Sequence, residues 1–172
     1  MVRIVAGIVV LVACGYMGLF LADKFKRRVR ELEELENAMT QLEYMIDFLG
    51  VTLSEAFAKI ASNSETQLKF VFAYVSERLR KSPSSNMQGV WQRAIEKYRE
   101  GLSLSDKDLE ILKDFAAMLG TGDRETEKNN IKITTMRLKL AIEEARLEKG
   151  KNVKMYRGLG FLCGMLIVIV LI

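Results

Sequence analysis

Residues 27–49, RRVRELEELENAMTQLEYMIDFL, carry the pattern that decides the fold. Large apolar side chains recur there at alternating intervals of three and four residues: Leu32, Leu35, Met39, Leu42, Ile46 and Leu49. An α-helix turns once in about 3.6 residues, so this spacing puts them on one side of a helix. Gly50 follows, and glycine readily adopts the left-handed conformation that ends helices. The stretch therefore predicts a helix that ends at Gly50 and buries this leucine row in a bundle core.

An apolar run precedes this helix: IVAGIVVLVACGYMGLFLA at residues 4–22, without a charged residue. At 1.5 Å per residue a helix of this length spans roughly 28 Å, close to the thickness of a hydrocarbon core. A second uncharged run, GLGFLCGMLIVIVLI at residues 158–172, spans roughly 22 Å and is short for a crossing. We expect a transmembrane helix at 4–22, a cytoplasmic domain at 23–157 and a C-terminal transmembrane segment at 158–172.

Basic residues cluster beside the two apolar runs: Lys24, Lys26, Arg27, Arg28 and Arg30 after the first, and Lys149, Lys151, Lys154 and Arg157 before the second. Lys and Arg are enriched on the cytoplasmic flanks of membrane helices, so the domain between the runs is expected in the cytoplasm. Basic residues beside a lipid bilayer account for the net charge of +4. We therefore expect the bilayer as a partner and no binding of nucleic acid.

Two processing signals compete with a retained N-terminal anchor. A secretory signal peptide needs a small-residue cleavage site, but the run ends FLAD at residues 20–23. LVAC at residues 11–14 resembles a lipoprotein cleavage box, which would lipidate Cys14. The apolar residues after Cys14 and the basic cluster beyond them favour the anchor instead.

Capping signatures predict further helices in the middle of the chain. TLSE at residues 52–55 is a capping box, whose hydroxyl and carboxylate bond to the open amides of a helix start. Similar signatures stand at residues 64–67 and 105–108, and the loop SPSSN at 82–86 precedes a helix from about Met87. The residues expected in the core are Leu68, Phe72, Val75, Leu79, Trp91, Ile95, Tyr98, Leu109, Leu112, Phe115, Ala116 and Leu119.

A sixth helix is expected after residues 121–123. It carries one apolar row at Ile131, Thr135, Leu138, Ile142 and Ala145, and a second at Ile133, Met136, Leu140 and Leu147. Because the two rows make a broad apolar face, we expect this helix in the middle of the bundle, against the leucine row. With one proline in the chain and no strand-like alternation, the fold class is all-α: a cytoplasmic bundle of about six helices flanked by N- and C-terminal transmembrane helices.

The composition removes most catalytic and metal chemistry. Histidine is absent, and both cysteines, Cys14 and Cys163, lie in the apolar runs. The commonest general base and metal ligand is therefore missing, and the domain has no thiol for a disulfide or a zinc site. We expect no enzyme, no cofactor and no bound metal.

The acidic residues of the first helix are expected at its exposed surface. Arg27 with Glu31, and Arg30 with Glu34, are four residues apart and predict ion pairs there. The carboxylates that neighbour one another in this helix diverge around it, which argues against a metal patch.

Four strings resemble the stage III sporulation protein AB family: LEYMI at 42–46, GVTLSEAF at 50–57, LGTGDRE at 119–125 and KMYRGLG at 154–160. The order of an apolar run, a basic stub, a leucine-rich helix and a glycine-punctuated terminal run is also similar, over essentially the whole chain. Two departures are Thr52, where the family commonly has proline, and Glu127, where glutamine is common. Both residues suit a helix start.

The resemblance implies a function. The cytoplasmic domain of the family is similar to that of F-type platform proteins of type II secretion and type IV pilus machines. This implies a non-enzymatic scaffold of a secretion-like channel complex between mother cell and forespore during endospore formation. The implied partners are channel subunits, including a cytoplasmic ATPase, and the implied location is the mother-cell membrane around the forespore.

Two groups of residues are candidates for contacts. Near the start of the sixth helix these are Gly120, Asp123, Arg124 and Glu125, which lie in the string that resembles the family. The string lacks the Lys-Ser or Lys-Thr pair of a phosphate-binding loop, so we expect helix capping and partner contact there. In the apolar runs the candidates are Gly7, Gly18, Gly160 and Gly164, because small residues let helices approach closely in lipid, within one chain or between copies in a homo-oligomer.

Two other functions stay open from the residues alone. One is a membrane-anchored signalling or nucleic-acid-binding adaptor, which a basic stripe on the folded bundle would favour. The other is a membrane-tethered enzyme, which would need a convergent polar site.

Overall fold

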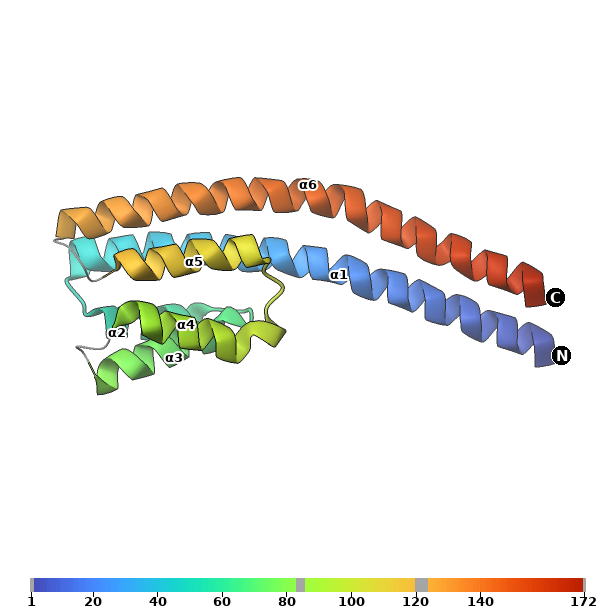
Figure 1. Ribbon diagram of the computed structural model, residues 1–172, viewed down its shortest axis with the longest axis horizontal. Helices are drawn as coiled ribbons and strands as arrows, with labels where there is room; N and C mark the ends of the chain where they lie inside the picture. Colours follow the sequence, from blue (N-terminus) through green and yellow to red (C-terminus); the bar gives the residue numbers. More distant parts are fainter. Residues whose placement is uncertain (1, 83–85, 120–123, 172) are drawn as a thin grey trace. The chain divides into compact units, whose positions relative to one another are not determined.

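The computed structural model describes residues 2–82, 86–119 and 124–171; for residues 2–15, 17–21, 124, 154, 156–157 and 159–171 it describes the backbone alone. Every regular element of these residues is helical (Figure 1). The elements are α1 (Val2–Tyr44), η1 (Met45–Leu49), α2 (Leu53–Asn63), α3 (Leu68–Lys81), α4 (Met87–Tyr98), η2 (Arg99–Gly101), α5 (Asp106–Met118) and α6 (Arg124–Leu171). The prediction of an all-α fold with about six helices is confirmed for this part of the chain.

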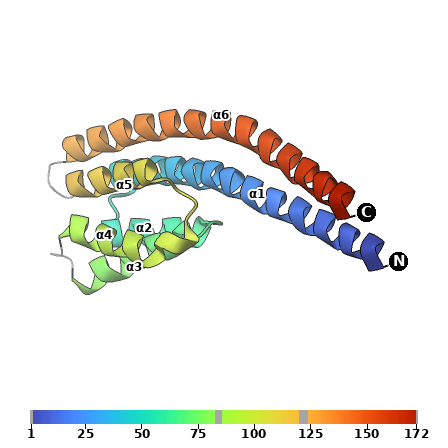
Figure 2. The ribbon, with the colours of Figure 1, turned by 45° about the vertical axis from the view of Figure 1, so that its right-hand side comes forward.

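The chain divides into two compact units. The first comprises Met1–Val29 and Glu144–Ile172, where the beginning of α1 and the end of α6 run side by side (Figures 1 and 2). Among its described apolar side chains, those of Val29 and Ala145 are buried. An ion pair of 2.5 Å also joins Arg28 to Glu148 across the two helices.

The membrane predictions fall mostly on residues whose side chains are not described. Among the described residues, no helix is both long enough and apolar enough to qualify as a membrane span. Four glycines are predicted to pack helices in lipid: Gly7, Gly18, Gly160 and Gly164. They lie in α1 and α6, where the structure describes the backbone alone.

The second unit, Arg30–Glu143, is a helix bundle. The leucine row is buried there as predicted: Leu32, Leu35, Met39 and Leu42 are 0% exposed and Ile46 is 8% exposed. The prediction fails at Leu49, which is 49% exposed. The helix changes at Met45–Leu49 into a π-helical turn. Because a π turn takes more residues than an α turn, it rotates the last side chains away from the row.

Gly50 ends this helix with φ 59° and ψ 24°. This left-handed conformation is the one predicted for a glycine at a helix C-terminus. It turns the chain into the segment that leads to α2.

An aromatic cluster forms the centre of the layer made by α2, α3 and α4, and α5 adds one ring to it. Trp91 is 0% exposed, and its ring centroid lies 5.5 Å from Phe57, 6.0 Å from Phe72 and 6.0 Å from Phe115. All three contacts are edge to face, the arrangement that aromatic rings favour over a sandwich. The prediction that Trp91 and Ile95 are core residues is confirmed, but Tyr98, predicted with them, is only half-buried.

Two of the three predicted capping boxes are present. The Glu55 amide donates to Thr52 Oγ1 at 3.3 Å, and the Thr52 amide donates to the Glu55 carboxylate at 3.1 Å. Ser105 and Asp108 make the same two bonds at 3.2 and 2.8 Å. These reciprocal bonds satisfy amides that the first turns of α2 and α5 leave open.

The start of α3 differs from the capping box predicted at residues 64–67. The helix begins at Leu68, whose amide donates to Thr66 Oγ1 at 3.2 Å. Glu34 of α1 accepts from the amides of Glu65 and Thr66 at 3.2 and 3.1 Å. A carboxylate from another helix thus satisfies amides that the local sequence was expected to cap.

Two acidic residues of α1, Glu31 and Glu34, bond to loops instead of forming the predicted surface ion pairs. Arg27 pairs with Asp23 at 2.8 Å. Glu31 is 2% exposed and accepts from the Ser103 amide at 2.8 Å, which ties the segment between α4 and α5 to α1. Glu34 bonds to the segment before α3. The predicted pairing of Arg27 with Glu31 is therefore wrong.

The predicted position of α6 is also wrong. Ile131 is 0% exposed and Leu138 is 0% exposed, but the second row faces outward, with Ile133 38%, Met136 66% and Leu140 73% exposed. Two residues along a helix correspond to about 200° of rotation, so Ile133 must face away from Ile131. In Figures 1 and 2 α6 forms one edge of this unit, with α1 and α5 on one side of it. A helix at an edge can bury only one of its rows.

Candidate partner-contact site

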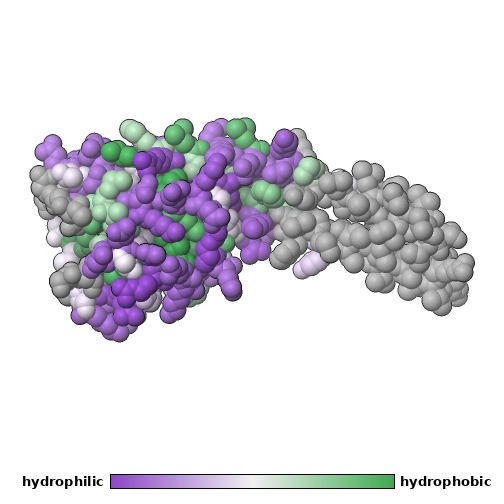
Figure 3. Space-filling view, in the orientation of Figure 1, coloured by the Kyte–Doolittle hydropathy of each residue, from purple (hydrophilic) through white to green (hydrophobic). Residues whose placement is uncertain are grey.

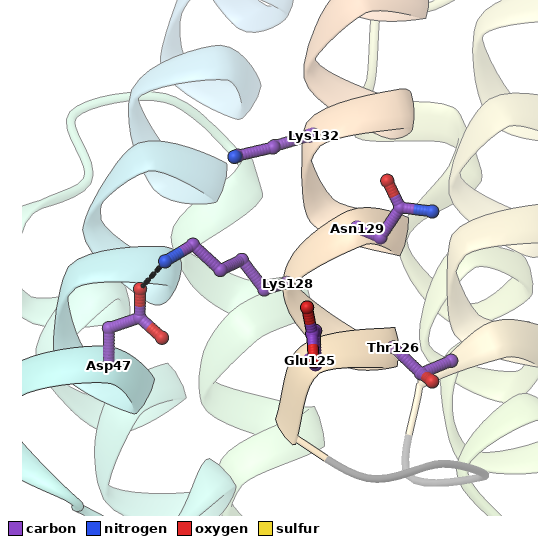
Figure 4. Close-up of a pocket in the computed structure, with 6 residues that line it drawn as sticks. All are labelled: Asp47, Glu125, Thr126, Lys128, Asn129 and Lys132. Atoms are coloured by element: carbon purple, nitrogen blue, oxygen red, sulfur yellow. Dashed lines mark ion pairs between the residues drawn. The ribbon is translucent and has the colours of Figure 1, made fainter.

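A surface hollow of about 720 Å³ lies between η1 and the first turns of α6 (Figure 4). Asp47 contributes from η1, and five residues contribute from α6: Glu125, Thr126, Lys128, Asn129 and Lys132. In Figure 4 the side chains of Lys128 and Lys132 extend from α6 toward the helix that carries Asp47. The lining residues that the structure describes are all polar or charged, so the hollow offers polar contacts.

One of the four residues predicted for partner contact, Glu125, lies at this hollow. Gly120 and Asp123 lie outside the described residues. Arg124 is the first residue of α6, and its side chain is likewise not described. Glu125 is exposed and lines the hollow. Their role in partner contact stays a prediction.

An ion pair between Lys128 and Asp47 crosses the hollow at 2.5 Å. The hydrogen bond and the charge of Asp47 raise the pKa of Lys128, and the charges of Glu43 and Glu125 raise it further. A lysine with a raised pKa stays protonated near neutral pH and is a poor base or nucleophile. The ion pair therefore links η1 to α6, and Lys128 is not suited to act as a general base.

The sequence prediction missed a pair of exposed aromatic residues beside this hollow. Tyr44 is 55% exposed and Phe48 is 75% exposed, and their rings stack with centroids 5.2 Å apart. The signal was present, because these residues are four apart and neither belongs to the leucine row. The π turn at η1 then presents Phe48 and Leu49 to solvent next to Asp47.

The outer α6 row, which we define as Ile133, Met136 and Leu140, begins one residue after Lys132 of the hollow. In Figure 3 hydrophobic side chains gather along the upper edge of the molecule, over α6. Contiguous apolar groups rimmed by polar ones mark interaction sites on protein surfaces. The hollow and the row together form a mixed polar and apolar surface.

Sequence comparison assigns this bundle to a family. The model of the family described as stage III sporulation protein AB matches residues 3–172. The chain belongs to the stage III sporulation protein AB family. The resemblance found in the sequence motifs is thereby confirmed, and membership supports a role in sporulation. The name of the family refers to a stage of sporulation and to no enzymatic reaction.

Two members of the stage III sporulation protein AB family illustrate the likeness. The protein of that name from Bacillus subtilis (strain 168) is 29% identical over 171 residues, which cover 99% of both chains. A solved structure of stage III sporulation protein AB has a TM-score of 0.67 at 26% identity and covers 73% of this chain and 98% of its own. That structure thus shares the helical fold over the matched part of this chain.

Proposed function

We propose that the chain is a non-enzymatic membrane scaffold of a secretion-like channel complex between mother cell and forespore. One observation carries this proposal: a member of a sporulation family exposes the outer α6 row to solvent. Met136 and Leu140 are 66% and 73% exposed. Covering a large aliphatic side chain stabilises a complex by about 1.5 to 3 kcal/mol at most, so two or three of them make a substantial contact.

In our proposal, channel subunits dock on this surface, and one of them is a cytoplasmic ATPase. The polar hollow beside the row supplies the directional contacts that apolar burial lacks, through Glu125, Lys128 and Lys132. An apolar centre with a polar rim is the usual anatomy of a protein interface. Additional copies of this chain can pack through the glycine positions of the apolar runs.

The apolar runs at residues 4–22 and 158–172 anchor the domain in the membrane in this proposal. Basic residues on the domain side of both runs favour a cytoplasmic domain, because Lys and Arg are retained on that side. A reporter that is active only in the cytoplasm, fused after Ser84, is expected to be active. Activity of an export-dependent reporter at the same position contradicts this topology.

The scaffold proposal is tested with substitutions that keep the shape of a carboxylate side chain but remove its ability to transfer a proton. Each of these carboxylates is changed in turn to its amide: Glu43, Asp47, Glu55, Asp123 and Glu125. An isosteric amide keeps shape and most hydrogen bonds but cannot transfer a proton, so a scaffold tolerates the change better than an enzyme does. Spore formation is scored beside recovery of the complex from sporulating cells. A variant that abolishes sporulation while its complex assembles fully contradicts the scaffold and points to an active site.

One observation favours a second candidate, the adaptor that binds an anionic macromolecule. Cationic side chains lie among aromatic rings on α3 and α4, with Lys97 5.1 Å from the ring centroid of Tyr74. A surface that gathers cationic side chains attracts anionic partners through its charge.

A further inference from the structure

The surface shared by α3 and α4 has no role in the scaffold proposal. The two helices pack against each other and lie side by side in Figures 1 and 2. We name as the α3–α4 surface the exposed or half-buried residues Phe70, Tyr74, Arg78, Lys81, Arg93, Lys97 and Tyr98.

Three aromatic rings of this surface form a continuous cluster. The rings of Phe70 and Tyr98 stack with centroids 5.9 Å apart, and Tyr74 meets Tyr98 edge to face at 6.4 Å. Phe70 is 42% exposed. The cluster therefore offers a rigid, partly apolar platform at the surface.

Cations cover the rings. Lys97 Nζ lies 5.1 Å from the centroid of Tyr74 and 5.3 Å from that of Tyr98, and Arg78 lies 5.3 Å over Tyr74. Lys69 lies 4.9 Å over Phe70. These distances are within the range of cation–π attraction, which holds the cationic groups in place.

A small hollow of about 70 Å³ lies beside the rings. Arg78, Lys81 and Arg93 line it together with Tyr74, Ser82 and Val90, so its described lining holds three cations and no carboxylate. Lys81 pairs with Glu77 at 2.6 Å. This hollow is large enough for one carboxylate, since a water molecule occupies about 30 Å³ of the liquid.

The two arginines are oriented by neutral groups. Arg78 Nε donates to the Tyr74 hydroxyl at 3.2 Å, and Arg93 Nε donates to the Gly89 carbonyl at 3.0 Å. A guanidinium has five N–H donors, so each arginine keeps further donors for an anion. Charge-assisted bonds from arginine to a carboxylate are among the stronger hydrogen bonds of proteins.

We propose that the α3–α4 surface binds an acidic protein segment, with one carboxylate in the hollow between Arg78 and Arg93 and an apolar side chain against the exposed part of Phe70. The cationic lining is complementary in charge to such a segment. Nucleic acid fits less well, because binding of single strands depends on free ring faces for base stacking. Here each ring is stacked on another ring or covered by a cation. This surface does not include the outer α6 row, so either proposal can fail alone.

The test uses the full chain in nanodiscs of zwitterionic lipid and measures fluorescence anisotropy of three labelled probes. The probes are a peptide of alternating Glu and Leu, its analogue with Gln for Glu, and a single-stranded oligonucleotide. We expect the acidic peptide to bind at least about tenfold tighter than the Gln analogue and to weaken as salt rises. Equal binding of the two peptides overturns the proposal. So does tighter binding of the oligonucleotide, which would establish a nucleic-acid surface.

Variants locate the binding on the bundle. Arg78→Gln, Arg93→Gln and Lys97→Gln together are expected to weaken the acidic peptide by roughly tenfold, since exposed ion pairs each contribute modestly. The matched control changes three exposed lysines on other helices, Lys59→Gln, Lys107→Gln and Lys113→Gln, and is expected to bind as the parent does. Circular dichroism checks the fold, and Lys97→Gln alone replaces the triple variant if that one unfolds. An equal loss in variant and control overturns the assignment.

Discussion

The aromatic cluster and the outer α6 row are both made of large hydrophobic side chains on helices, yet they have opposite surroundings. Trp91, Phe57 and Phe72 are 0% exposed at the centre of α2, α3 and α4. Met136 and Leu140 are 66% and 73% exposed at the edge formed by α6. The difference teaches that apolar residues in this chain serve two purposes. The cluster stabilises the fold, and the row is free to be covered by a partner.

The largest loss of stability is expected for Trp91→Ala. Removing this ring leaves a cavity among three others, and such substitutions cost about 3 to 5 kcal/mol. Chemical unfolding of the full chain in zwitterionic detergent, followed by circular dichroism, measures the change. The control is Trp91→Phe, which keeps an aromatic ring. Its cost is expected to be smaller, because Trp91 Nε1 has no hydrogen-bond partner among the described residues. Equal losses for the two variants would show that ring packing is not the source of stability.

A second large loss is expected for Leu42→Ala. Leu42 is 0% exposed in the leucine row, and truncation of a buried leucine costs about 2 to 5 kcal/mol. The matched control is Leu49→Ala, at the exposed end of the same row. The same unfolding measurement should show a much smaller change there. A loss below about 0.5 kcal/mol for Leu42→Ala is the size typical of surface positions and would contradict its burial.

A smaller effect is expected at the start of α2. Thr52→Ala removes the hydroxyl that accepts from the Glu55 amide, and loss of such a cap costs about 1 kcal/mol. Thr52→Ser keeps the acceptor and is expected to lie close to the parent in unfolding free energy. If Thr52→Ser destabilises as much as Thr52→Ala does, the capping bond is not responsible.

The smallest change of stability is expected for Met136→Gln combined with Leu140→Gln. Both side chains are exposed, so the free energy of unfolding should stay within about 0.5 kcal/mol of the parent. The control is Leu138→Gln, on the opposite, buried side of α6. It should destabilise strongly because Leu138 is 0% exposed. Similar losses for both variants would show that the outer α6 row is part of the core.

Periodicity predicted most of the fold because each helix carries its own signal. Leu42 is buried as its place in the leucine row predicts. The capping bonds of Thr52 and Ser105 each lie within a single helical turn. The failure at Leu49 is local, because the π turn at Met45–Leu49 rotates it outward, but the other failures depend on elements far apart in the sequence. Glu31 is buried because the segment at Ser103 passes beside it, 72 residues along the chain. No local pattern contains that contact.

The exposed surfaces could be predicted only in part. Two apolar rows on α6 were visible in the sequence, but which row faces the bundle depends on which helices pack beside α6. Glu125 was predicted as a contact residue from a family motif. Asp47, which also lines the hollow and pairs with Lys128, lies on η1, far from that motif in the sequence. The hollow between Arg78 and Arg93 requires two helices to meet, and no single motif contains both residues.

The central claim is that the chain acts by holding partners on the outer α6 row. The direct measurement is recovery of channel subunits with the tagged full chain from sporulating cells in mild detergent. The account predicts that the pair Met136→Gln and Leu140→Gln lowers recovery and spore formation together, while Ala117→Gln, at an exposed alanine of α5, changes neither. Undiminished recovery and sporulation with the α6 pair would contradict the account.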